Sequence, residues 1–308
     1  MSAVIGAFAA LVAVAVLGYV VGLAGVLRSQ DELVLSRVAF FVATPALMFT
    51  TVARADLHSI FSVVLVTNLA GLFVVQVLFL LVAVVIWRRT RSQATIGVLA
   101  SSYVNAGNLG VPVAAYVLGN GALVAPIVLF QVVVMAPIAF AVLDSDRRGS
   151  GRRVPLRTVL TRPLRNPLTV ASLLGLFVSL LGVRLPDLLM RPIDLVAAAA
   201  VPIALIAYGL SLSAGTKDSI TLRRDVVLAV ALKTFAQPLT AYVIARWVLD
   251  LHGTALLAPT LLAALPTAQN VYVYAVQYRA SRTLARSAVL LSTLLSIPTM
   301  ILIAGLLA

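Results

Sequence analysis

Apolar residues dominate the chain in long runs that are separated by short polar gaps. Most runs reach about 20 residues, the length that an α-helix needs to cross the hydrocarbon core of a bilayer. The pattern predicts ten membrane-spanning helices, at residues 3–27, 33–53, 61–87, 94–118, 122–143, 167–183, 193–213, 225–249, 255–278 and 287–308. We therefore expect an all-α polytopic membrane protein that keeps its first apolar run, because that run is too long for a signal-peptide core.

The composition fits a lipid environment and excludes several other classes of protein. Of the 308 residues, 62% are hydrophobic and 11% are charged, and the mean hydropathy is +1.09. The chain has no cysteine, and both histidines, His58 and His252, lie in polar gaps. This excludes disulfides, thiolate metal sites, iron–sulfur clusters and a cysteine nucleophile. We expect no metal, no cofactor and no enzymatic activity.

The formal net charge of +13 is concentrated in the gaps between the runs. Counted over alternate gaps, 17 Lys and Arg residues fall on one side of the predicted membrane and three on the other, namely Arg54, Arg184 and Arg191. Short cytoplasmic loops collect Lys and Arg. We therefore expect a multi-pass protein of the plasma membrane with both termini outside. The basic charge then indicates topology in a lipid bilayer rather than a nucleic-acid partner.

The apolar runs divide into two halves of five. The longest gap, 145–166, is basic and separates a first half, 1–144, from a second half, 167–308. A shift of 157 positions superposes Gly18 on Gly175, Gly25 on Gly182 and Pro45 on Pro202. Because five is odd, the second half would enter the membrane from the opposite side. The sequence predicts two inverted five-helix repeats joined by a short cytoplasmic loop.

The fourth run carries polar and helix-breaking residues near its middle, namely Asn105, Gly107, Asn108, Gly110 and Pro112. Proline lacks an N–H and clashes with the preceding turn, and glycine lowers the cost of unwinding. Backbone groups freed at membrane depth are tolerated only where they face protein or a wet cavity. We expect a broken helix whose amides line such a cavity.

The ninth run repeats this composition with Pro266, Gln269 and Asn270. Two broken helices in matching places of inverted halves would cross near the midplane and direct helix N-termini at a common point, where a carboxylate can bind. Packing is the alternative reason for Gly, Pro and Asn in a membrane helix. Either explanation fits one run alone, whereas the pair favours a site.

Two further polar residues are predicted at membrane depth. Lys233 lies roughly 12 Å into the eighth run, where a bare ammonium costs at least ~2.5–3.5 kcal/mol and no Asp or Glu lies at a comparable depth. It either holds carbonyls of a broken helix or contacts an anionic substrate. Gln131, in the middle of the fifth run, either makes an interhelical hydrogen bond or lines the site.

With these residues in place, the chain resembles the auxin efflux carrier family, which includes the plant PIN-FORMED auxin exporters and bacterial permeases usually assigned to malate, malonate or similar acids. The resemblance rests on an Asn-x-Gly-Asn-x-Gly-x-Pro stretch at 105–112 and on weaker stretches at 36–45, 127–131, 233–238, 265–278 and 296–298. In this order the stretches span nearly the whole chain.

The resemblance implies a scaffold unit, a transport unit, and broken helices 4 and 9 that cross at Pro112 and Pro266. It also implies a homodimer built on the scaffold helices. Lys233 would support the crossing. The family's substrate contacts carry over to Asn105, Asn108 and Gln131.

The chain departs from the plant exporters at two places. Their large hydrophilic loop is reduced here to residues 145–166, which argues against kinase-regulated control. The third run offers Asn68 and Gln76 where the plant branch carries an acidic residue near the lysine, so an Asp–Lys pair is not expected.

The expected function is export of small organic anions, such as auxin-like monocarboxylates or malate and malonate, by alternating access at the crossing. The rival is a sodium-coupled organic-anion symporter of the bile-acid symporter type, which shares the broken-helix plan. That type uses intramembrane carboxylates around sodium; here carbonyls with Asn108 and Gln269 could hold one ion. An intramembrane enzyme is disfavoured, because Ser101 and Ser102 have no candidate base except Lys233.

Overall fold

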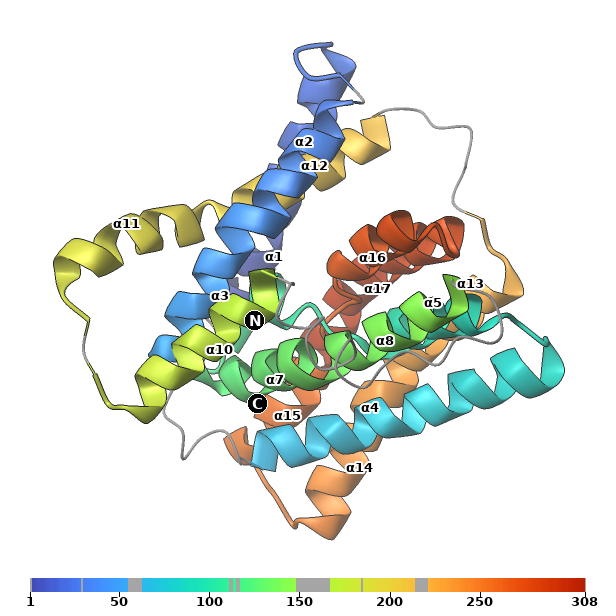
Figure 1. Ribbon diagram of the computed structural model, residues 1–308. Helices are drawn as coiled ribbons and strands as arrows, with labels where there is room; N and C mark the ends of the chain where they lie inside the picture. The colour runs from blue at the N-terminus through green and yellow to red at the C-terminus, as the bar shows by residue number, and fades with distance from the viewer. Residues whose placement is uncertain are drawn as a thin grey trace.

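The computed structural model describes residues 2–28, 30–54, 63–110, 113–114, 117–147, 167–183, 185–213 and 221–307. Within these ranges every regular element is a helix (Figure 1), and the one extended pairing is an isolated antiparallel bridge between Val104 and Thr267. The helical class is therefore as the hydropathy pattern predicts. The predicted basic loop lies outside the described residues from 148 to 166.

The elements of the part up to residue 147 are α1 (Ser2–Leu23), α2 (Asp31–Val38), η1 (Ala39–Ala43), α3 (Thr44–Ala53), α4 (Val63–Leu81), η3 (Val82–Ile86), α5 (Arg91–Ser102), η4 (Ala106–Gly110), η5 (Gly121–Val124), α7 (Ala125–Phe130), η6 (Gln131–Met135) and α8 (Ala136–Arg147). The later elements are α10 (Pro167–Leu180), α11 (Asp187–Ala198), α12 (Ala200–Ser213), α13 (Arg224–Ala231), η8 (Leu232–Ala236), α14 (Gln237–Val243), η9 (Ile244–Val248), α15 (Thr254–Ala263), α16 (Asn270–Tyr278) and α17 (Arg282–Leu307). Helices α11 and α17 begin earlier than hydropathy predicts, because each starts with a polar turn, at Asp187 and Arg282.

Five helical stretches of the described residues are long and apolar enough to cross a bilayer, namely Asp31–Ala53, Val63–Ile86, Asp187–Ala207, Arg224–Val248 and Arg282–Leu307. Shorter apolar helices accompany them at Val12–Leu23 and Thr254–Ala263. Large apolar side chains are exposed along these helices, for example Phe73 and Val77 on α4. Such surfaces are stable in lipid and not in water. The chain is a multi-pass membrane protein.

Prolines explain several irregular turns within the long helices. The π-helical turns η1, η6 and η8 each end just before a proline, at Pro45, Pro137 and Pro238. Proline has no N–H to donate to a carbonyl of the preceding turn. In a π-helical turn the hydrogen bonds span five residues instead of four, which changes the pairing of the carbonyls before the proline. Because η6 begins with Gln131 and η8 contains Lys233, these two polar side chains project from irregular turns rather than from regular helix.

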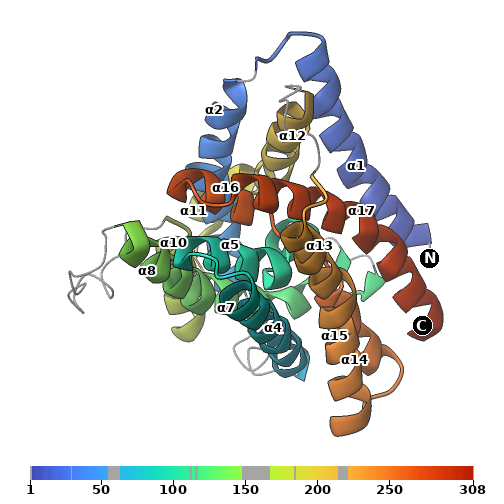
Figure 2. The ribbon, with the colours of Figure 1, turned by 90° about the vertical axis from the view of Figure 1, so that its right-hand side faces the viewer.

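The helices form two groups that are visible in Figures 1 and 2. In the first helix group, α1 packs along α12, α10 packs along α3, and α2 and α11 join them. The second helix group consists of α4, α5, α7, α8 and α13 to α17. The groups meet where α3 contacts α7, where α10 contacts η6, and where α1 contacts α17.

Two glycines allow the close packing in the first helix group. A Cβ at Gly18 of α1 would collide with the backbone of Ile206 in α12, and a Cβ at Gly175 of α10 would come within 2.8 Å of the carbonyl oxygen of Phe49 in α3. Larger residues at these positions would force the backbones apart. In both helix pairs, α1 with α12 and α10 with α3, a glycine thus lets the two backbones approach closely.

Candidate functional site

The second helix group contains two broken helices that meet backbone to backbone. Helix α5 ends at Ser102, and Tyr103 is already extended, with φ −77° and ψ 102°. Helix α15 ends at Ala263, and α16 begins only at Asn270. Between these ends, the N–H of Asn105 donates to the carbonyl of Pro266 at 2.8 Å, and the N–H of Ala268 donates to Tyr103 at 2.9 Å. We call this pairing the crossing.

Buried side chains satisfy carbonyls that the break in α5 leaves without helical partners. The hydroxyl of Thr267 donates to Ala100 at 2.6 Å, and the Nε2 amides of Gln131 and Gln237 donate to Val104 at 3.0 Å and to Ser102 at 3.4 Å. The last four carbonyls of any helix lack partners within that helix, and orphaned carbonyls are costly in a buried site. These side chains therefore stabilise the break.

Lys233 serves the other broken helix. Its Nζ donates to the carbonyl of Ala263 at 3.0 Å, at the C-terminal end of α15, and its exposed fraction is 0%. A cation at a helix C-terminus is favourable because the carbonyls there carry partial negative charge. Within the part of the chain that the structure describes, Lys233 forms no ion pair. The sequence left two roles open for Lys233, namely to hold carbonyls of a broken helix or to contact an anionic substrate. The contact with Ala263 is of the first kind.

A small cavity lies between the crossing and the first helix group. It is lined by Thr44, Met48, Tyr103, Val104, Asn105, Ala106, Gly107, Val128, Gln131, Val132, Ala268 and Asn270, and its volume is about 20 Å³. A volume of this size holds roughly one water molecule. The cavity is therefore too small for any organic acid in this conformation.

Asn105 is a buried polar residue of this cavity. Its exposed fraction is only 5%, and its side-chain amide has no hydrogen-bond partner among the described residues. Asn270 lines the cavity at the start of α16. An amide can donate to a carboxylate and accept from a hydroxyl. The cavity thus combines an available amide with the N-terminal, partially positive end of α16.

The structure brings together four of the residues that the sequence nominates: Asn105, Gly107, Gln131 and Asn270. Gly110 ends η4 and does not line the cavity, and a Cβ added to it would lie 3.0 Å from side-chain atoms of Leu265 and Val124. Gln269 precedes α16 as its N-cap residue but does not line the cavity. The backbone of Asn108 lies in η4, whereas its side chain and all of Pro112 are outside the described residues.

The backbone pairing at the crossing joins the segment around Val104 to the segment around Thr267, and the carbonyl of Pro266 takes part in it. Pro112, the other proline expected at the crossing, lies outside the described residues. The backbone is extended at Tyr103, and carbonyls of the preceding turn accept hydrogen bonds from Thr267, between α15 and α16, and from Gln237 at the start of α14. Those donors come from distant parts of the sequence, and a local search for proline and glycine does not find them.

Sequence reasoning also missed the wall that the first helix group contributes. Thr44 and Met48 lie one turn apart on α3 and face the crossing. The available signal was Thr44 directly before Pro45, a polar residue at a helix irregularity. Val128 and Val132 complete the apolar side, and nothing in the sequence distinguishes them from lipid-facing valines.

Aromatic side chains close the side of the crossing next to Tyr103. The rings of Tyr103 and Tyr274 lie 6.3 Å apart edge to face, and Phe140 contacts Tyr274 at 4.8 Å and stacks on Tyr278 at 5.8 Å. Aromatic pairs in these geometries contribute about 0.5–1.5 kcal/mol each beyond their burial. They fix α16 against α8 and hold Tyr103 at the cavity wall.

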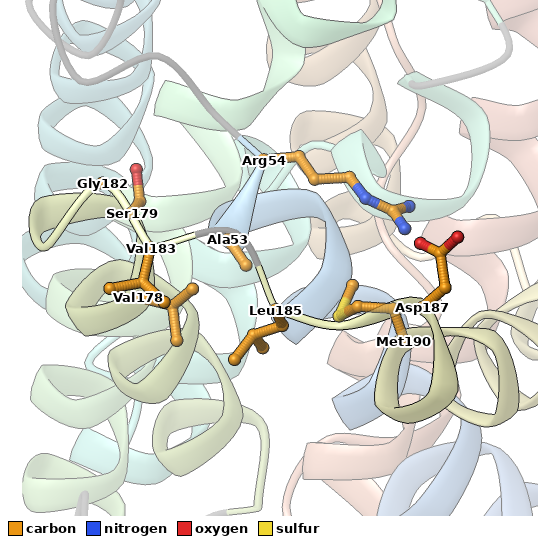
Figure 3. Close-up of a pocket in the computed structure, with 9 residues that line it drawn as sticks. All are labelled: Ala53, Arg54, Val178, Ser179, Gly182, Val183, Leu185, Asp187 and Met190. Atoms are coloured by element: carbon orange, nitrogen blue, oxygen red, sulfur yellow. The ribbon is translucent and has the colours of Figure 1, made fainter.

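A larger cavity, of about 500 Å³, lies elsewhere, between the ends of α3 and α10 and the start of α11 (Figure 3). Arg54 and Asp187 line it, with apolar residues such as Val178 and Leu185. The guanidinium of Arg54 already pairs with the carboxylate of Asp194 at 2.7 Å. We favour the crossing as the functional site despite its smaller volume, because two broken helices meet there beside Asn105, whose side-chain amide has no hydrogen-bond partner among the described residues.

Comparison with known proteins agrees with this architecture. The model of the membrane transport protein family matches residues 3–148 and 150–304, so the chain belongs to that family, which is the auxin efflux carrier and malonate permease-like family expected from the sequence. The chain is therefore a membrane transporter and not an enzyme.

Two relatives illustrate the similarity. An "Uncharacterized transporter" of Methanothermobacter thermautotrophicus is 32% identical, over 91% of this chain and 91% of its own. A protein of Rhizobium meliloti named "Putative malonate transporter" is 28% identical, over 84% of this chain and 82% of its own. Both alignments cover most of each chain, so the likeness extends to the whole architecture.

Proposed function

We propose that the chain is a secondary transporter that exports small organic anions across the plasma membrane by alternating access at the crossing. The observation that carries the proposal is Asn105, which is 5% exposed, lines the small cavity between the crossing and the first helix group, and has a side-chain amide without a hydrogen-bond partner among the described residues. A membrane protein tolerates such broken backbone only where it faces protein or a functional cavity. The relative named for malonate supports an organic acid as the substrate class.

The contacts within the first helix group support two inverted repeats, 1–144 and 167–308. Gly18 approaches Ile206, and Gly175 approaches Phe49. The two contacts correspond, because Gly175 follows Gly18 by 157 positions and Ile206 follows Phe49 by the same 157 positions. Gly25 and Gly182 share the same spacing and both have positive φ, 71° and 63°. In this proposal α1 to α3 and α10 to α12 form a scaffold, and the second helix group moves against it.

The position of Lys233 supports a structural part in transport. Its ammonium group donates to the carbonyl at the end of α15, and Lys233 does not line the cavity. In our proposal Lys233 keeps the broken helix in register while the second helix group moves. It is a positioning residue, whereas Asn105, Asn108, Gln131, Gln269 and Asn270 belong to the substrate region.

The proposed orientation places both termini outside, on the strength of the charge asymmetry between alternate loops. An anion leaving an inside-negative cell gains about 2.3 kcal/mol per charge for each 100 mV. This corresponds to roughly fiftyfold accumulation outside per 100 mV. Export of a monovalent acid would then need no coupling ion, and the scaffold would provide the surface for a homodimer.

One observation keeps sodium coupling as a second candidate. The side-chain oxygens Asn68 Oδ1, Thr234 Oγ1 and Gln237 Oε1 are buried without hydrogen-bond partners among the described residues. Oxygen atoms of this kind can bind a hard cation. The test is uptake of a radiolabelled acid into proteoliposomes with sodium or with potassium as the only cation. Export by the membrane potential predicts equal rates, and a loss of transport without sodium would favour the symporter.

A further inference from the structure

We propose that the cavity at the crossing accepts a substrate with one negative charge and an uncharged, apolar remainder, and that Met48 sets this preference. The inference rests on the proposed function, since it specifies which organic anions the same site transports. It separates monocarboxylates from dicarboxylates such as malonate.

The cavity offers compensation for one carboxylate only. Asn105 presents an amide that has no hydrogen-bond partner among the described residues, and Asn270 lies at the positive end of α16, which is equivalent to roughly half a charge. None of the described side chains that line the cavity is charged.

The remaining walls are unsuited to a second carboxylate. Val128 and Val132 from α7 and η6, together with Met48 from α3, form the apolar side of the cavity. Lys233 is committed to the carbonyl of Ala263 and does not line the cavity. An ionised group that is buried without a partner is strongly disfavoured. A second charge would therefore weaken binding, whereas an apolar body would fit this wall.

Met48 is the part of the wall that can yield. Its side chain is buried, and its Cε lies 3.0 Å from the position that a Cβ on Gly107 would occupy. The glycine thus leaves the space that the thioether fills. Methionine is unbranched and flexible, and it adapts its shape more readily than valine. In this proposal a substrate that enters the 20 Å³ cavity displaces the Met48 side chain, which then contacts the uncharged part of the substrate.

The test uses pairs of anions with the same skeleton and different charge. Purified protein in proteoliposomes is presented with malonate and malonamate, and with succinate and succinamate, at about pH 8, where every carboxyl group is ionised. Butyrate and benzoate extend the panel to apolar bodies. Competition against the best transported acid of the panel is measured for each compound. The inference predicts that each monoamide competes at a concentration at least about tenfold lower than its dianion.

Two substitutions at Met48 test the residue assignment. Met48→Lys places a cation on the apolar wall and is expected to reverse the malonate-to-malonamate preference by at least about tenfold. Met48→Leu, a swap of similar volume, should keep the preference of the unmodified protein. If Met48→Lys is not monodisperse after purification, Val132→Lys introduces the charge from η6 instead of α3, and we expect the same reversal of the preference.

The outcomes distinguish this inference from the proposed function. Equal or tighter binding of malonate than of malonamate to the unmodified protein overturns the charge selectivity and leaves organic-anion transport standing. If Met48→Lys or Val132→Lys folds but leaves the malonate-to-malonamate preference unchanged, the assignment of these residues to the wall that faces the uncharged part of the substrate is overturned. If no acid of the panel binds or is transported, the proposed function itself is wrong.

Discussion

Thr267 gives the sharpest test of how the crossing is held together. Its side chain is fully buried, and its hydroxyl donates to the carbonyl of Ala100 at 2.6 Å, across the break in α5. The change Thr267→Val keeps the shape and removes the donor. The carbonyl of Ala100 then lies near the end of α5 with no side-chain partner, at a cost of about 1–3 kcal/mol. For a chain of this size we expect a fall in the unfolding temperature of roughly 2–5 °C.

Thr240 provides the matched control. Its hydroxyl also donates to a carbonyl, that of Ala236 at 2.8 Å, but both residues lie in the continuous helix that contains α14. Within a continuous helix a carbonyl also accepts a backbone N–H from the next turn, so the Ala236 carbonyl is not left without a partner when the hydroxyl is removed. Thr240→Val should therefore change stability by only a few tenths of a kcal/mol.

The assay is thermal unfolding of the detergent-purified variants, followed by intrinsic tryptophan fluorescence under identical conditions. The reasoning requires Thr267→Val to unfold clearly below Thr240→Val. Equal unfolding temperatures for the two variants would refute the claim that side-chain donors hold the crossing. A matching loss of transport in Thr267→Val alone would connect the crossing to function.

Three further predictions concern the site, the packing and the orientation. Asn105→Ala should weaken substrate binding about tenfold or more while the protein stays monodisperse, because the free amide is lost; wild-type affinity by equilibrium binding would place the site elsewhere. Gly175→Ala should lower the unfolding temperature by several degrees, because its Cβ would stand 2.8 Å from the Phe49 carbonyl oxygen, whereas Gly305→Ala, with nothing within 4 Å, should not. Cysteine at Ser59, in a chain with no native cysteine, should react with an impermeant thiol reagent on intact cells and cysteine at Ser150 only after permeabilisation; labelling of Ser150 on intact cells would reverse the proposed topology.

The helical class and the location of both breaks could be predicted from the sequence, because hydropathy and the Asn, Gly and Pro clusters are local signals. The exact crossing point could not be predicted from Pro112, because it is set by donors such as Thr267 and Gln237 that lie far away in the chain. The sequence could not decide whether Lys233 holds helix carbonyls or contacts a substrate, because the structure alone shows its contact with the carbonyl of Ala263. Thr44 and Met48 could not be assigned to the cavity, because the packing of the two helix groups decides which face of α3 is turned toward the crossing.

The central claim is that the crossing moves a small organic anion without a coupling ion. The most direct test is the current recorded on a solid-supported membrane when an organic acid is added to proteoliposomes that contain the protein. The account predicts a current without a pH gradient and without sodium, strongly reduced in Asn105→Ala and lowered by Lys233→Ala, with partial retention in Lys233→Arg because arginine keeps a cationic donor. A substrate flux that carries no charge, or one that disappears when the pH gradient alone is collapsed, would contradict it.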